Sequence, residues 1–215
     1  MKRSTPRTIP FGLPDGQIHS ERQYRYVRPL QMGLLTEDEA RTTAKDLNEL
    51  VVKNGWHLNT GFLTTAHLCR VLADNGHVDT AYRLLLQNEC PSWLYAVKKG
   101  ATTIWETWDG VRADGTVHDS LNHYSYGAIS GWLFGGVCGI RLQAGKLTIR
   151  PQPDRTLGYA KAEWRSPVGT ICSAWEYKEN KLIFDFTLPV PAQIVLPDGK
   201  QIEASAGEVH DEILL

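Results

Sequence analysis

The sequence lacks long hydrophobic runs, an excess of charge of one sign, and cysteine pairs. No apolar stretch reaches the roughly 18–20 residues that a membrane-spanning helix needs. The 23 Lys and Arg residues nearly balance the 24 Asp and Glu residues, which gives a formal net charge of −1. Binding of nucleic acid or of an anionic membrane surface requires a concentrated basic face. We therefore expect no nucleic-acid partner and no membrane partner.

The first residues of the sequence do not have the pattern expected of an export signal. Its first residues, MKRSTPRTIPFG, are basic, but no apolar run of about 7–15 residues follows them. We therefore expect a cytoplasmic protein.

The four cysteines, Cys69, Cys90, Cys138 and Cys172, are widely spaced and form no C-x-x-C pair. Disulfide frameworks are typical of short secreted chains, and a zinc site needs closely spaced ligands. Each cysteine stands among apolar or small residues, which favours buried free thiols. We expect neither a metal ion nor a cofactor.

The chain divides near residue 145 into a helical part and a strand-rich part. We expect an extended segment over residues 1–17, helices within residues 18–142 and strands within residues 143–215. The clearest helix begins at Thr36, which forms a capping box with Glu39, and ends at Gly55. Further helices are expected over residues 22–32, 64–75, 78–87 and 124–138. Asn75 and Gly76 join two of them, which predicts an αα-hairpin.

After Gly139 short apolar runs alternate with turn residues. Six strands are expected, over residues 146–150, 160–164, 170–177, 181–188, 192–196 and 209–215. In one of them Phe184, Phe186 and Leu188 form a strict apolar face. Short strands at about ten-residue spacing are typical of a β-sandwich or a jelly roll. The fold class is thus mainly α followed by antiparallel β.

The connection between the helices expected at 78–87 and 124–138 has no helical periodicity and carries most of the polar chemistry. Loops of this length in a compact domain are usually functional. One run, ATTIWETWDG, contains Trp105, Glu106, Trp108 and Asp109, and His123 follows near the next helix. Aromatic faces stack on sugar rings and carboxylates perform acid–base chemistry, so the run indicates a sugar site. It fits equally a core edge at which Glu106 caps a helix, with His123 as a structural residue.

Five consecutive motifs support a family resemblance. They are NGWHLNTGFLTT from Asn54, LADNGHVDTAYRLLLQ from Leu72, PSW from Pro91, KGATTIWETWDG from Lys99 and NHYSYGAISGWL from Asn122. In order and spacing they resemble bacterial α-L-rhamnosidases of glycoside hydrolase family 78, over residues 20–200. The resemblance implies that residues 18–142 are part of an (α/α)6 barrel, followed by a C-terminal β-sandwich. It also implies inverting hydrolysis of terminal α-L-rhamnosides.

The resemblance assigns roles to particular residues. The glutamate of the family's T-T-x-W-E motif is the general base that activates water, and here it is Glu106. The histidine of the N-H-Y motif contacts the bound sugar, and here it is His123. Trp105, Trp108 and Asp109 surround Glu106 in the sequence, and we expect them to bind substrate as well.

Two departures from the family pattern bear on activity. Thr107 stands where relatives usually carry Arg, and nothing in residues 1–26 matches the upstream acidic motif that supplies the family's general acid. Inverting hydrolysis needs two carboxyl groups roughly 6.5–9.5 Å apart. The barrel also needs twelve helices, and the sequence predicts about half that number. We therefore expect the C-terminal portion of a rhamnosidase, which is catalytically incomplete by itself.

The expected partners follow from this interpretation. They are a rhamnose-containing glycoside and either the N-terminal half of the barrel or another copy of this chain. The alternative function is a non-catalytic carbohydrate-binding or interaction module that retains the loop aromatics. A structural remnant without sugar affinity is a third possibility.

Overall fold

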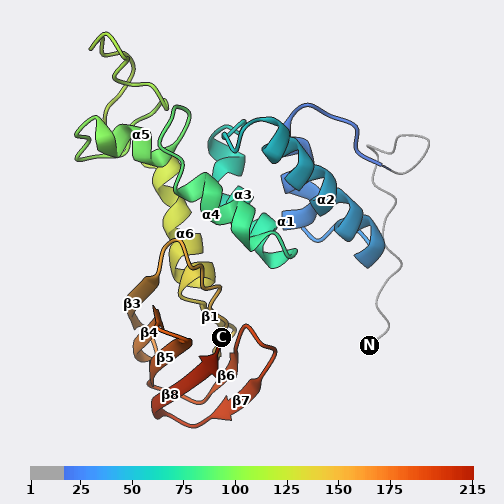
Figure 1. Cartoon of the computed structure of the whole chain (residues 1–215), viewed down its shortest axis with the longest axis vertical. Helices are drawn as coiled ribbons and strands as arrows, with labels where there is room; N and C mark the ends of the chain where they lie inside the picture. The colour runs from blue at the N-terminus through green and yellow to red at the C-terminus, as the bar shows by residue number, and fades with distance from the viewer. Residues whose placement is uncertain (1–16) are drawn as a thin grey trace. The chain divides into compact units, whose positions relative to one another are not determined.

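The computed structural model describes residues 17–215 (Figure 1). The extended segment predicted for residues 1–17 lies outside the described residues except for Gln17. The chain forms two compact units, one ending at Ile129 and the other spanning Ser130–Leu215. The predicted order of helices followed by β-sheets is confirmed. None of the helices in residues 17–215 combines the length and apolar character needed to cross a membrane.

Over residues 17–129 the first unit contains five α-helices and a short 3-10 helix. They are α1 (Gln23–Gln31), α2 (Glu37–Lys53), α3 (Phe62–Asp74), α4 (Val78–Leu85), α5 (Trp93–Lys98) and η1 (Ser125–Ile129). Helix α1 packs against α2 and α3, and α3 also packs against α4 and η1. Helix α3 is therefore the centre of this unit.

The capping box predicted at the start of α2 is confirmed. The main-chain N–H of Glu39 donates to Thr36 Oγ1 at 3.4 Å, and the main-chain N–H of Thr36 donates to Glu39 Oε2 at 2.8 Å. Each bond satisfies an N–H group that a helix start leaves without an intrahelical partner. The same residues hold the pKa of Glu39 below its usual range, because both the main chain and the side chain of Thr36 donate to its carboxylate.

The predicted αα-hairpin is formed by α3 and α4. The turn closes where the N–H of His77 donates to the carbonyl oxygen of Leu72 at 2.9 Å. Leu68, Leu72 and Leu84 are fully buried between the helices. These apolar side chains recur at helical spacing, which is why the sequence predicts the hairpin.

Two helical predictions need correction. The connection after residue 88 contains α5, whose start is capped by Ser92, since its hydroxyl accepts from the N–H of Tyr95 at 3.1 Å. Helix α5 has only six residues, too few for a periodic apolar pattern to be visible. The single helix predicted over residues 124–138 is instead η1, α6 (Ser130–Trp132) and the π-helical η2 (Leu133–Val137). Its many glycines weaken regular α-helical geometry.

The cysteine prediction is correct in part. All four thiols are free, and Cys69 and Cys138 are buried. Burial raises the pKa of Cys138 to about 11, so this thiol is inert at neutral pH. Cys90 is exposed, because it lies in the surface loop before α5 rather than on an apolar helix face.

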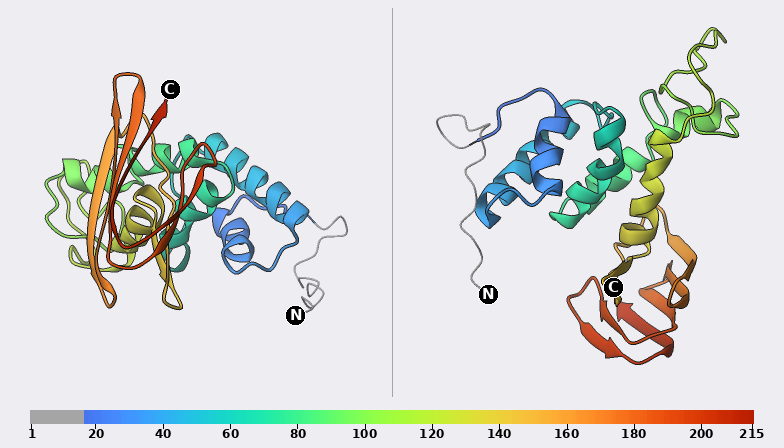
Figure 2. Two further views of the ribbon diagram at one scale, coloured as in Figure 1. Left: turned by 90° about the horizontal axis from the view of Figure 1, so that it is seen from below. Right: turned by 180° about the vertical axis from the view of Figure 1, so that it is seen from behind.

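The second unit contains eight strands in two four-stranded sheets (Figure 1 and Figure 2). The strands are β1 (Ile140–Gln143), β2 (Lys146–Ile149), β3 (Tyr159–Ser166), β4 (Gly169–Lys178), β5 (Lys181–Leu188), β6 (Ala192–Val195), β7 (Gln201–Ala204) and β8 (Gly207–Leu214). The sheet orders are β1-β2-β6-β7 and β3-β4-β5-β8. All pairs are antiparallel except β2 with β6. Strands β1 and β7 are additions to the six predicted strands.

The core of this unit comes from alternating side chains. Phe184, Phe186 and Leu188 of β5 are buried, as their spacing predicts. Ile171 and Trp175 of β4 are also buried. The outward positions between them are polar or more exposed, which is the pattern of a sheet with one solvated face.

Side chains from the strands of the second unit donate hydrogen bonds to the last carbonyl groups of η2 and of its C-cap. Trp175 Nε1 donates to the carbonyl of Val137 at 2.7 Å, and Ser173 Oγ donates to that of Cys138 at 2.6 Å. Arg141 Nε reaches the carbonyl of Gly135 at 2.7 Å. Helix ends leave about four such acceptors without intrahelical donors. These side chains therefore fix the end of η2 to the strands that follow it.

We predict that Ser173→Ala destabilises the second unit by about 1–3 kcal/mol, because the buried carbonyl of Cys138 loses its side-chain donor. The measurement is the urea midpoint at which β4 loses hydrogen-exchange protection. The control is Ser205→Ala, an exposed residue expected to change stability by less than about 0.5 kcal/mol. Equal midpoints for the two variants would contradict this account.

Candidate active site

The candidate site is built on the loop between α5 and η1, whose two arms are hydrogen-bonded to each other. The N–H of Glu106 donates to the carbonyl of Ser120 at 2.9 Å, and the N–H of His123 donates to that of Ile104 at 2.7 Å. Thr103 Oγ1 also donates to the carbonyl of Leu121 at 2.5 Å. These bonds place Glu106 and His123, which are far apart in the sequence, on adjoining arms of one loop.

The carboxylate of Glu106 is anchored on one side. Its Oε2 accepts from the main-chain N–H of Ser120 at 3.2 Å. The other oxygen, Oε1, has no partner among residues 17–215, and the side chain is half-buried. A carboxylate fixed at one oxygen and open at the other can accept a proton from a bound water.

The aromatic residues of the loop form a cluster. Trp108 stacks on Tyr126 with ring centroids 3.8 Å apart, and its ring meets that of Trp93 edge-on at 5.4 Å. Trp93 Nε1 donates to the carbonyl of Tyr126 at 2.9 Å. Trp105 is buried, with 4% of its surface exposed, and packs close to Gly110. A Cβ on Gly110 would lie 3.3 Å from the Trp105 ring, so the glycine permits this contact.

Two hollows adjoin the cluster, and Trp108 and Tyr126 line both. The smaller hollow, about 230 Å³, is also lined by Trp93, Trp105 and Thr107. The larger, about 550 Å³, lies on the side of α1 and of the loop before α3. Glu106, Asp109 and His123 are not among the lining residues of either hollow. Of the five predicted site residues, the two tryptophans thus line the same hollow. The three polar residues line neither hollow.

His123 is held between aromatic rings. Its ring stacks on Phe62 at 4.8 Å and on Tyr124 at 5.2 Å. The N–H of Ser125 donates to His123 Nδ1 at 3.4 Å, which assigns the proton of the neutral ring to Nε2. Phe62 was not among the predicted site residues, although it stands in the motif that begins at Asn54. Its position in that motif is the signal that identifies it.

The carboxylate of Asp109 forms ion pairs with two residues of the same loop. Its Oδ1 lies 3.3 Å from His118 Nε2 and its Oδ2 lies 3.6 Å from Arg112 Nε. His118 Nε2 also faces the carbonyl of Asp109 at 2.9 Å, while Nδ1 faces Asp119 Oδ2 at 2.8 Å. Both ring nitrogens therefore meet acceptors, which only the doubly protonated imidazolium satisfies. The hydrogen bond that His118 donates to the Asp119 carboxylate raises the pKa of His118 accordingly.

Thr107 follows Glu106 and is half-buried, with its hydroxyl oxygen out of contact with solvent. Its hydroxyl has no hydrogen-bond partner among the described residues, and it lines the smaller hollow. Within residues 17–215 no three His, Cys, Asp or Glu side chains lie close enough together to hold a metal ion.

Comparisons with known proteins match both parts of the chain. The family model described as the bacterial α-L-rhamnosidase 6 hairpin glycosidase domain matches residues 10–137. The model described as the bacterial α-L-rhamnosidase C-terminal domain matches residues 145–211.

Individual relatives agree with these matches. An α-L-rhamnosidase of Streptomyces avermitilis is 35% identical over 85% of this chain and 19% of its own length. One of Formosa agariphila is 38% identical over 81% of this chain and 20% of its own length. The chain thus spans about a fifth of the length of these relatives.

The chain is also similar to part of the solved structures of two α-L-rhamnosidases. The S. avermitilis α-L-rhamnosidase complexed with L-rhamnose has a TM-score of 0.87 at 30% identity, covering 94% of this chain and 22% of that one. The α-L-rhamnosidase of Aspergillus terreus has a TM-score of 0.89 at 27% identity, covering 94% and 25%.

We predict that the loop over residues 107–119 is better protected from hydrogen exchange at a pH below about 6.5 than at a higher pH. Because folding raises the pKa of His118, its proton stabilises the folded loop below the reference pKa of about 6.5. That stabilisation is lost as the pH rises through the raised value. The measurement is the hydrogen-exchange protection of the loop, corrected for intrinsic rates, across this range.

His118→Gln should remove the pH dependence of protection in this loop. The matched control is His210→Gln, since the pKa of His210 is also raised by a neighbouring carboxylate, Asp185, but in the second unit. A pH dependence that persists in His118→Gln and disappears in His210→Gln would contradict the assignment.

Proposed function

Because the chain belongs to the bacterial α-L-rhamnosidase family, we propose that it carries the water-activating part of an inverting α-L-rhamnosidase site. In this proposal Glu106 is the general base and a rhamnose-containing glycoside is the substrate. The observation that carries it is the geometry of Glu106, whose Oε2 is fixed by Ser120 while Oε1 has no partner within residues 17–215. The family match over residues 10–137 includes this loop and supports the assignment.

The proposed chemistry is a single displacement. Glu106 takes a proton from a water molecule as the water attacks the anomeric carbon, while a second carboxyl group protonates the departing oxygen. The bond to the aglycone breaks as the bond to water forms, and the configuration at the anomeric carbon inverts. Anchoring of Oε2 holds the free oxygen in one orientation, which favours proton transfer along one direction.

His123 is the proposed contact to the sugar. Since Nδ1 accepts from Ser125, Nε2–H is left to donate to a sugar hydroxyl. Stacking on Phe62 and Tyr124 restricts the ring to one plane. Trp108 is proposed to bind substrate by its ring surface, whereas the burial of Trp105 and the ion pairs of Asp109 suit the shaping of the loop.

The proton donor is proposed to be a carboxyl group outside residues 17–215. No acidic motif of the family's type occurs in residues 1–26, and Glu106 alone provides one of the two groups that inversion needs. The N-terminal half of the barrel or another copy of this chain is the proposed source. The isolated chain is then catalytically incomplete.

A non-catalytic sugar-binding role is the second candidate. It is favoured by one observation: the two hollows are lined by aromatic side chains but not by Glu106. Sugar affinity without turnover, even after the missing half is supplied, would identify this role.

We predict negligible release of nitrophenol from an aryl α-L-rhamnoside by the isolated chain. When the chain is joined to the upstream half of a relative's barrel, turnover should appear. In that hybrid Glu106→Gln should lower kcat by about 10²–10⁴-fold, because the base is lost while the size of the side chain is kept. The control is Glu208→Gln, an exposed residue of the second unit, which should leave kcat unchanged.

Robust turnover by the isolated chain that Glu106→Gln abolishes would show that the proton donor lies within it. Turnover of the hybrid that survives Glu106→Gln would refute Glu106 as the base.

We predict that L-rhamnose changes the tryptophan fluorescence of the chain and that His123→Phe weakens this binding about tenfold. Phenylalanine keeps the ring contacts with Phe62 and Tyr124 but removes Nε2–H, together with the Nδ1 acceptor of the Ser125 N–H, so a sugar that bonds to this ring is held less tightly. His210→Phe is the control in the second unit. Unchanged affinity in His123→Phe would count against a sugar contact at this residue.

A further inference from the structure

The larger hollow of the first unit has one charged residue in its lining, Arg22. Tyr24, Asn59, Trp108 and Tyr126 line it as well. Its volume, about 550 Å³, lies within the range of about 300–1,000 Å³ that small-molecule sites occupy. The hollow is therefore large enough for a sugar and carries a net positive charge.

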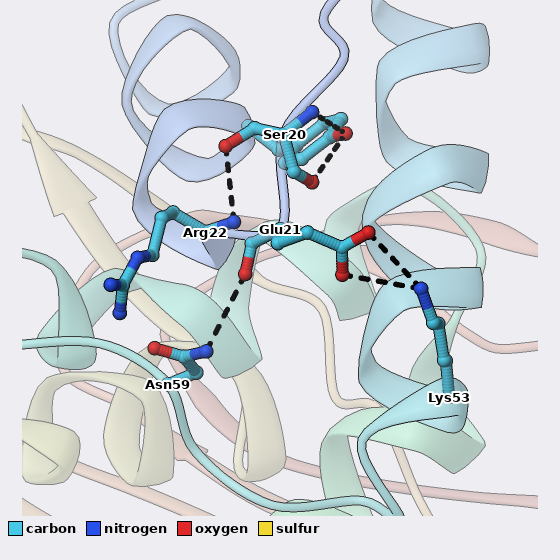
Figure 3. Close-up of polar contacts among 6 residues, drawn as sticks. Ser20, Glu21, Arg22, Lys53 and Asn59 are labelled. Atoms are coloured by element: carbon cyan, nitrogen blue, oxygen red, sulfur yellow. Dashed lines mark hydrogen bonds and ion pairs between the residues drawn. The ribbon is translucent and has the colours of Figure 1, made fainter.

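The guanidinium of Arg22 has no ion-pair partner in the described part of the chain. The adjacent carboxylate, Glu21, is taken up by Lys53, whose Nζ lies 3.1 and 3.2 Å from its two oxygens. Figure 3 shows the Arg22 side chain extending beside Asn59, on the side away from Lys53. The Glu21–Lys53 pair thus removes the nearest counter-charge and leaves the guanidinium available to a ligand.

A buried glutamine, Gln23, ties the main chain next to Arg22 to the main chain at Asn59. Gln23 is fully buried, its Nε2 donates to the carbonyl of His57 at 2.9 Å, and its Oε1 accepts from the N–H of Asn59 at 2.7 Å. Asn59 Nδ2 also reaches the carbonyl of Glu21 at 3.5 Å. A buried amide with both ends satisfied ties the start of α1 to the loop before α3, so the main chains that carry Arg22 and Asn59 are held next to each other.

The chemistry of the lining matches an acidic sugar. A guanidinium binds a carboxylate through two parallel hydrogen bonds, and an amide binds hydroxyls. The stacked rings of Trp108 and Tyr126 offer an apolar wall to the C–H face of a sugar ring. A neutral sugar would leave the Arg22 guanidinium without a counter-charge.

We propose that this hollow binds a sugar that carries a carboxylate, with Arg22 on the carboxylate and Asn59 on a hydroxyl. Its assignment as the sugar to which rhamnose is attached rests on the proposed function, since Trp108 belongs to the same loop as Glu106.

The test compares two ligands that differ only at C6, methyl glucuronide and methyl glucoside, by ligand-observed NMR with the full chain. We expect the uronide to bind about tenfold more tightly, because bonds to charged groups are the stronger ones. Arg22→Gln should bring the two affinities within about twofold. Arg25→Gln, which removes the same charge from an exposed position of α1 outside the hollow, should keep the preference.

Equal affinities for the two ligands, or a preference that survives Arg22→Gln, would overturn this inference whatever the chain does with rhamnose. A preference for the uronide that Arg22→Gln removes supports it, even if L-rhamnose fails to bind. Failure of L-rhamnose to bind would count against the proposed function alone. A failed inference about the hollow can therefore be told apart from a failed proposed function.

Discussion

The hydrogen bonds that join residues 104–106 to residues 120–123 are the constraint on which the candidate site depends. Ordering a loop costs roughly 1–2 kcal/mol of conformational entropy per residue, so a long loop needs contacts that close it. Here the closing contacts are main-chain bonds at Glu106 and His123 themselves. The residues that we assign to water activation and to sugar binding are thus the same residues that hold the loop together. Their main chains close the loop, and each side chain keeps one polar atom, Glu106 Oε1 and His123 Nε2, outside the hydrogen bonds of the loop.

The same closure sets the position of the aromatic wall. Trp108 follows Glu106 in the loop and stacks on Tyr126, which belongs to η1 and packs near α3. Both rings of this stack line the two hollows. A ligand that moves Trp108 from the larger hollow therefore acts on the loop of the proposed base. In the proposed function, Trp108 therefore connects sugar binding directly to the loop that carries Glu106.

The sequence predicts the features that arise from local pattern. The Thr36–Glu39 capping box, the hairpin around Asn75 and Gly76 and the alternation of Phe184 with Phe186 each depend on residues within a few positions of one another. Helix α5 and strands β1 and β7 are too short for such a pattern to be visible. Other features join segments that are far apart in the chain. They are the stack of His123 on Phe62 and the hollow that Arg22 lines together with Trp108. A local sequence pattern cannot predict such contacts. Family resemblance names Glu106 and His123 but does not give their contacts.

The charged side chains of the loop over residues 107–119 explain how a carboxylate-rich turn stays closed. Asp109 and Asp119 both lie against His118, and Arg112 adds a second positive group beside Asp109. Without these cations the two carboxylates would repel each other across the turn, and Asp119 already has a left-handed backbone with φ of 55°. Protonated His118 offsets both costs by bonding to Asp119 and to the main chain of Asp109. The electrostatics of the turn thus help to hold Glu106, because its carboxylate is anchored to Ser120, the residue that follows Asp119.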